Sequence, residues 1–257
     1  MEEPTQVGPA ALLRRITVPI GLAVALVVVA AWYVTWASAD FLMALMAPSR
    51  IASTDLVLFF VLLIVMMVAM MLPSAMPMML AFRGMTRLER GRPTKPADNA
   101  ATALFVLPYF LTWGAFGVAA LFALMALGLM GSMTNVVVFA SAGTLVTAGL
   151  WQVTRTKEVC LTNCTSPMEF VMHHWRSGWL GAWWMGLRHS LYCVGCCWLF
   201  MVVLFVAGSM SLVWMGGLSI VIFAEKVGVR PLLFSRAIGL GLVLLGSLVG
   251  IQALGTL

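Results

Sequence analysis

The chain has 257 residues, of which 62% are hydrophobic and only 9% are charged, and its formal net charge is +6. Soluble domains carry about 25% charged residues, so this composition excludes a soluble globular protein. A membrane β-barrel would show alternating segments of roughly ten residues, whereas the apolar runs here are long and unbroken. The sequence therefore predicts an all-α, polytopic bundle of transmembrane helices that forms a single membrane domain over residues 1–257.

About seven apolar segments are long enough to be considered as spans: residues 16–37, 56–81, 103–129, 133–153, 187–208, 210–224 and 233–254. The count falls to six if the first segment is removed after Ala39, where "ASA" resembles a signal-peptidase site, or if the short sixth segment is re-entrant. A signal peptide usually has an apolar core of roughly 7–15 residues. The first segment is longer than this, which favours a retained helix.

Lysine and arginine lie almost entirely on alternate sides of these segments, with Arg50 as the exception. Two polar segments, residues 83–100 and 154–178, carry many of these charges and are predicted to be cytoplasmic loops. The positive-inside rule then places the N-terminus in the cytoplasm. The positive net charge therefore indicates membrane topology, and no nucleic-acid partner is expected.

All five cysteines fall in one short window of the chain, close to a histidine. The candidate ligands in this window are Cys160, Cys164, His189, Cys193, Cys196 and Cys197. In "RHSLYCVGCCW" the histidine, the first cysteine and the last cysteine are four residues apart, and residues at this spacing share one face of a helix. The two cysteines of "CLTNC" have the same spacing. Two such pairs could meet where the fourth and fifth spans end.

Several interpretations of these cysteines compete. Free cysteines can be small buried hydrophobic residues, although five clustered ones are unusual. A structural disulfide is disfavoured because the predicted side is reducing. Cys193 and Cys196 form a CxxC motif, but redox motifs of this kind usually belong to soluble thioredoxin-like units. A metal site fits best, because thiolates and thioethers are soft ligands that select Cu(I), Zn or Fe–S.

The second apolar segment contains "VMMVAMMLPSAMPMMLAF", with seven methionines. Methionine is ordinary core filler, but this density also suits a soft-metal pathway. Three candidate ligands are taken from it: Met67, Met71 and Met78. Pro73 and Pro77 are expected to interrupt and kink the helix, because each removes a backbone hydrogen bond. The carbonyl of Ala69, freed in this way, would have to be buried in protein or line a cavity.

Glu225 and Lys226 close the sixth apolar segment. A carboxylate at a membrane boundary costs little free energy if it pairs with a cation. Glu225 is therefore expected to form a salt bridge with Lys226 or with Arg188.

Three blocks resemble a bacterial family of predicted metal-binding integral membrane proteins, domain of unknown function 2182. They are "MMVAMMLPSAMPMMLAF", "KEVCLTNCTSP" and "GLRHSLYCVGCCWLFMVVLFVAGSMSLVWMGGLSIVIFAEK". The chain departs from the family pattern at Ser190, where the family has glycine, and at Ser211, where it often has asparagine; neither change touches a thiol. The resemblance implies a metal-binding protein of the bacterial inner membrane and supplies no reaction.

Two functions from different classes follow from these patterns. The first is binding and transport or delivery of a soft metal, copper above all, through a Cys/His/Met site. The second is a non-catalytic structural or assembly subunit of a membrane enzyme complex, with a structural zinc or thiol site. An enzyme acting alone is not expected, because few groups in the spans could do acid–base chemistry. The expected partners are the lipid bilayer, the metal ion, and other membrane subunits or a second copy of the chain.

Overall fold

The computed structural model describes residues 9–41, 53–86, 88–89, 92–93, 98–127, 135–206 and 211–255, and nearly all of them are helical. The helices and strands are α1 (Pro9–Ala37), α3 (Ser53–Thr86), β1 (Leu88–Glu89), β2 (Arg92–Pro93), α4 (Asn99–Ala126), α5 (Asn135–Trp151), α6 (Arg155–Thr165), α7 (Pro167–His174), α8 (Gly178–Val206), α9 (Leu212–Val227) and α10 (Pro231–Gly255). The two strands form one short antiparallel pair. The all-α prediction is confirmed.

Each of the seven predicted apolar segments falls on one helix of the described chain: α1, α3, α4, α5, α8, α9 and α10. Four of these, α3, α4, α8 and α10, are long and apolar enough to cross a membrane. A fifth crossing is possible if α5 and α6, which meet at a bend of 68°, form one broken span. The helices thus show an integral membrane protein with four or five candidate spans.

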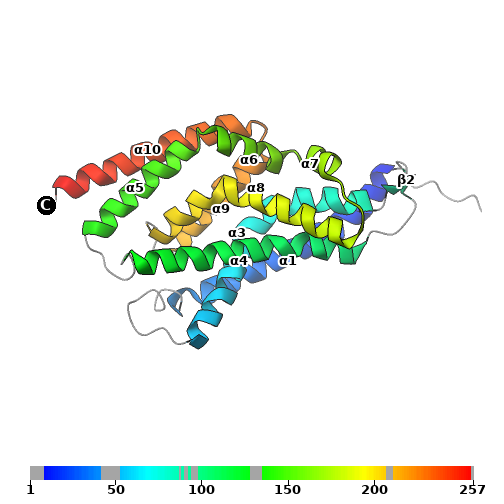
Figure 1. The fold of residues 1–257 in the computed structure, drawn as a ribbon, viewed down its shortest axis with the longest axis horizontal. Helices are drawn as coiled ribbons and strands as arrows, with labels where there is room; N and C mark the ends of the chain where they lie inside the picture. Colours follow the sequence, from blue (N-terminus) through cyan, green and yellow to red (C-terminus); the bar gives the residue numbers. More distant parts are fainter. Residues whose placement is uncertain are drawn as a thin grey trace, which may run out of the picture.

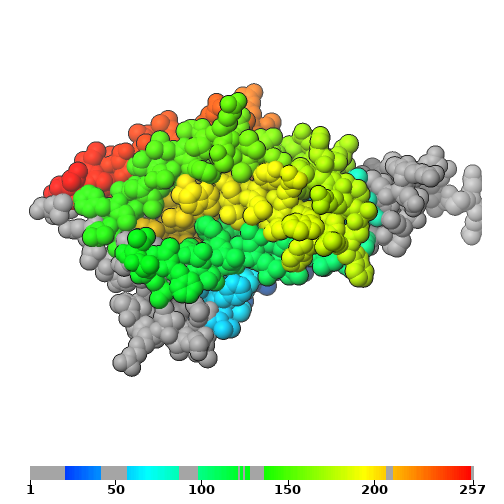
Figure 2. Space-filling model, viewed as in Figure 1, coloured from blue at the N-terminus to red at the C-terminus, as the bar shows by residue number. Residues whose placement is uncertain are grey.

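The central helix of the bundle is α8, which packs against α4, α5, α6 and α9. Figure 1 shows α4 and α8 running side by side in the same direction, while α5 and α10 form a pair along another edge. The end of α3, the starts of α4 and α8, and α7 gather at one end of the bundle. One side of α8 remains visible in the space-filling view, between α4 and the segment from α5 to α7 (Figure 2).

Helix α3 continues through both of its prolines, so neither Pro73 nor Pro77 ends the helix. The carbonyl of Ala69, four residues before Pro73, accepts a hydrogen bond from the indole nitrogen of Trp32 at 3.1 Å. A side chain of α1 therefore replaces the backbone donor that proline lacks. This contact anchors α1 to α3, and the carbonyl does not line an open cavity.

The predicted loop over residues 154–178 contains two helices, α6 and α7. Thr154 caps α6, since its hydroxyl accepts a hydrogen bond from the backbone N–H of Lys157 at 3.3 Å. A cap of this kind satisfies one of the backbone donors left free at a helix start. The chain therefore bends sharply after α5, and α6 packs against α8 instead of extending into solvent.

Candidate metal centre

Helix α8 carries four of the predicted ligands on the side that faces the protein interior. His189 is 3% exposed, Cys196 is 2% exposed, and Cys193 and Cys197 are fully buried. The spacing of three and four residues places them on neighbouring turns of one helix face. The sequence prediction that these side chains share a face is consistent with their common burial.

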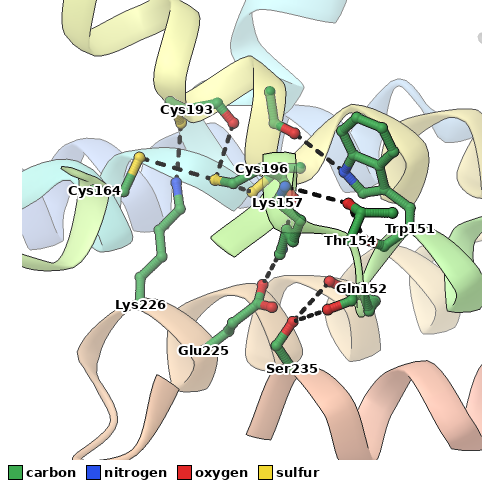
Figure 3. A network of polar contacts seen from close by, with 12 residues as sticks. Trp151, Gln152, Thr154, Lys157, Cys164, Cys193, Cys196, Glu225, Lys226 and Ser235 are labelled. Carbon is green, nitrogen blue, oxygen red and sulfur yellow. Dashed lines mark hydrogen bonds and ion pairs between the residues drawn. The ribbon is translucent and has the colours of Figure 1, made fainter. Parts of the chain in front are cut away.

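Four thiols from two helices form a buried group that we call the thiol cluster: Cys164, Cys193, Cys196 and Cys197. The sulfur of Cys196 lies 3.3 Å from that of Cys197 and 3.9 Å from that of Cys164 (Figure 3). The Cys196 thiol also donates to the backbone carbonyl of Cys193 at 3.2 Å. Helix α6 thus adds one thiol to the three of α8, across 32 residues of sequence.

Cys160 belongs to the same helix as Cys164 but occupies a different position. It is half-buried, and none of the described contacts joins its sulfur to another thiol. A Cβ added to Gly195 would lie 2.7 Å from the Cys160 sulfur. Gly195 therefore permits the close approach of α6 to α8 that brings Cys164 to the cluster.

The methionines of α3 and the thiol cluster belong to one buried core. The thioethers in this core are Met66, Met67, Met70, Met71, Met201 and Met215. Two of them, Met67 and Met71, were predicted as candidate ligands. Met78 lies elsewhere, in a second buried cluster with Phe82 and Phe105. Met201 could have been found from sequence, because it follows Cys197 by one helical turn, whereas nothing in the sequence points to Met215.

His189 lies in an aromatic box one turn before Cys193. Its ring stacks with Phe105 and Tyr109, at centroid distances of 5.9 and 6.2 Å, and meets the edge of Phe170 at 5.8 Å. Both of its ring nitrogens are buried and have no hydrogen-bond partner among the described residues. The thiol of Cys193 donates to the hydroxyl of Tyr109 at 3.5 Å, so Tyr109 touches both the histidine and the cluster.

Three buried charged side chains surround the thiol cluster, and sequence reasoning placed none of them at the site. Lys226 donates to the sulfur of Cys193, with 2.9 Å between Nζ and Sγ. Lys157 forms a salt bridge with Glu225, with 2.9 Å between Nζ and Oε2, and also donates to the backbone carbonyl of Cys196 at 2.6 Å. Figure 3 shows Lys226 directed toward the sulfur of Cys193.

The prediction that Glu225 pairs with Lys226 or Arg188 is wrong. Its partner is Lys157 of α6, because Lys226 points away from it toward the thiol cluster. Both lysines resembled ordinary loop charges in the sequence. A single basic residue at the end of an apolar segment has the same pattern whether it faces lipid headgroups or turns inward.

The chemistry of the cluster suits a soft ion of low coordination number. Neighbouring sulfur atoms of the cluster lie 3.3 Å and 3.9 Å apart, so one ion could contact two of them at once. In the described part of the chain, however, no group of three or more His, Cys, Asp or Glu side chains is arranged ready to enclose an ion. The cluster therefore offers thiolate pairs and neighbouring thioethers, which favour Cu(I), more readily than a closed zinc cage.

A cleft of about 320 Å³ lies between α7 and the first half of α8, apart from the thiol cluster. Its polar lining comes from His173, His174, Arg176 and Arg188. None of the cluster thiols lines it, so we do not place the metal centre there.

Comparison with known proteins assigns the family. A family model described as "PpoB2: Copper chaperone" matches residues 60–249, well over half of the chain. The match begins within α3 and ends within α10, and so includes every residue of the thiol cluster. No curated protein and no solved structure matches the chain.

Proposed function

The chain belongs to the PpoB2 family of copper chaperones, and on this premise we propose that it holds Cu(I) at the thiol cluster and delivers it to an acceptor. The observation that carries the proposal is the meeting of α6 and α8, which gathers four thiols from two helices in one buried place. Thiolates are the soft ligands that select Cu(I). The membrane helices and the copper family together describe a membrane-embedded copper-binding protein.

The methionines of α3 support a route to the cluster. Met67 and Met71 are at most 2% exposed and lie four residues apart in the same core as the thiols. A thioether binds soft ions without losing a proton, so a row of methionines can pass Cu(I) along a helix without changes of charge. Met78 lies in the other buried cluster, so we leave it out of this route.

His189 supplies the one imidazole near the thiols. A buried polar ring without a partner costs about 1–3 kcal/mol, and its retention beside Cys193 favours a role in binding. We place His189 as a ligand that the copper ion meets before or after the thiols, on the side of the cluster where Phe170 and α7 lie.

The topology belongs to the same proposal. All seven apolar helices would cross the bacterial inner membrane, with the N-terminus and the segment from α6 to α7 in the cytoplasm. Helix α9 has 16 residues, or about 24 Å of helix, and would cross where the protein thins the hydrocarbon layer. On this topology the thiol cluster lies toward the cytoplasmic side, where thiols stay reduced.

Metal analysis of the full-length protein in detergent tests the proposal. We expect copper to be bound when Cu(I) is supplied, and Cys193→Ser or Cys197→Ser to abolish it. Cys164→Ser should weaken it, whereas Cys160→Ser on the same helix is the matched control and should keep it. Bound zinc at one ion per chain, lost in the same variants, would instead support the structural-subunit function. Wild-type protein that takes up no Cu(I) would refute the thiol site.

A further inference from the structure

We propose that Lys226 is the counter-ion of the copper site and supplies the single positive charge that makes a Cu(I) bis-thiolate neutral inside the protein. The inference rests on the proposed function, since it assumes that the thiol cluster holds the ion. It adds a residue that determines how many thiolates can bind the copper ion.

The geometry separates Lys226 from every other charge nearby. Its side chain is 7% exposed, and its ammonium lies 2.9 Å from the sulfur of Cys193 (Figure 3). The carboxylate next to it in sequence, Glu225, is engaged by Lys157. Among the described residues, Lys157–Glu225 is the only ion pair closer than 4 Å. That pair is neutral by itself, so the charge of Lys226 is left for the sulfur atoms.

The sum of charges then limits how copper can bind. Cu(I) with two thiolates carries one negative charge, which Lys226 cancels. With three thiolates the same ion would leave one negative charge uncompensated, and an uncompensated buried charge is strongly unfavourable. We therefore expect two of the four thiols to bind Cu(I) as thiolates and the others to remain neutral. A zinc ion would need three thiolates to reach the same balance.

Stability of the metal-free fold alone does not explain why Lys226 is buried beside a thiol. Moving an ammonium out of water is costly, and charged residues inside membrane proteins are rare and tend to be functional. In the metal-free protein its described partner is one thiol. Replacing Lys226 by an uncharged side chain should therefore leave the metal-free fold at least as stable, while weakening the copper complex.

The test compares variants of the full-length protein in detergent. Cu(I) affinity is measured by competition with a coloured Cu(I) chelator, and thermal unfolding is recorded without metal. Lys226→Met removes the charge, Lys226→Gln also keeps a hydrogen-bond donor, and Lys226→Arg keeps the charge. Arg230→Met, four residues away and exposed, is the control with the same change in net charge.

We expect Lys226→Met and Lys226→Gln to weaken Cu(I) binding by about 100-fold, with metal-free unfolding temperatures no lower than that of the wild type. Lys226→Arg should stay within about 10-fold of the wild type, and Arg230→Met should match it. Sulfur counting by X-ray absorption should give two thiolate ligands in the wild type.

Three results would overturn the inference: wild-type affinity in Lys226→Met, an equal loss in Arg230→Met, or a loss of copper that accompanies an equal loss of metal-free stability. Each leaves the proposed function intact as long as the wild type binds Cu(I) through its thiols. A wild type that binds no Cu(I) would refute the proposed function itself, so the two failures can be told apart.

Discussion

The ammonium of Lys157 lies 2.9 Å from Oε2 of Glu225 and joins α6 to the last turn of α9. Both side chains are 1% exposed. The same ammonium donates to the carbonyl of Cys196, so one lysine connects α6, α8 and α9. This junction fixes the relative positions of the helices that contribute Cys164, Cys196 and Lys226.

Removing one partner of this junction should be far worse than removing both. Glu225→Gln leaves the Lys157 ammonium buried without its counter-charge, and breaking a buried pair in this way costs about 3–5 kcal/mol. The double variant Lys157→Met with Glu225→Gln removes the buried charge and should recover a large part of that loss. Thermal unfolding of the metal-free protein in detergent measures both. Equal losses in the single and the double variant would contradict this account of the pair.

A second contact, between Trp32 and the carbonyl of Ala69, should stabilise the bundle because Pro73 cannot donate to that carbonyl. Trp32→Phe keeps the ring but loses the N–H, and the unpaired carbonyl should cost about 1–3 kcal/mol. Adding Pro73→Ala to Trp32→Phe restores a backbone donor and should reverse most of the loss. Trp36→Phe, on an exposed position of the same helix, is the control and should have little effect. Unfolding free energies of these variants form the test, and a lack of rescue by Pro73→Ala would show that the carbonyl is not the cause.

The sequence predicts the helices of this fold well because their signal is local. Each long apolar run must satisfy its backbone within itself, so the seven predicted segments appear as seven helices. The shared face of Cys193 and Cys197 follows from the helical period alone. The number of membrane crossings depends on how α5 and α6 join, and a bend of 68° is not visible in composition.

The partners of the site residues could not be predicted because they depend on contacts between distant segments. The sequence does not distinguish Cys160 from Cys164 as a ligand. In the structure Cys160 packs on Gly195 of α8, and Cys164 is the one that reaches the cluster. Likewise Glu225 has a lysine beside it in sequence, yet its ion pair is with Lys157, 68 residues away. Hydropathy identifies such charges as boundary residues and does not reveal that they are buried.

Substitution of the α3 methionines should separate copper loading from folding. Met67→Leu with Met71→Leu nearly conserves volume, and such swaps usually cost less than about 1.5 kcal/mol each. Loss of these soft thioethers, which share a buried core with the thiols, should lower Cu(I) loading by about 10-fold, measured as bound copper against time. Met78→Leu is the matched control on the same helix, in the other buried cluster, and should load normally. Equal loading in the double variant and the wild type would show that Met67 and Met71 are only packing residues.

His189 provides the sharpest contrast between stability and function. Its two ring nitrogens are buried without partners in the described part of the chain, and its ring stacks among Phe105, Tyr109 and Phe170. His189→Phe keeps an aromatic ring in the box and removes both unpaired polar atoms. We therefore expect the variant to be more stable by about 1 kcal/mol and to load less copper, a trade-off found where function retains a destabilising group.

The control for this change is His173→Phe on α7, where the histidine is exposed and its Nδ1 contacts the carbonyl of Glu169 at 2.9 Å. This variant should alter neither stability nor copper content. A His189→Phe protein that is more stable and binds copper as the wild type does would remove His189 from the site. Reduced stability together with retained copper would mean that the ring nitrogens have a structural partner, and the aromatic box would then be a packing feature of α4, α7 and α8.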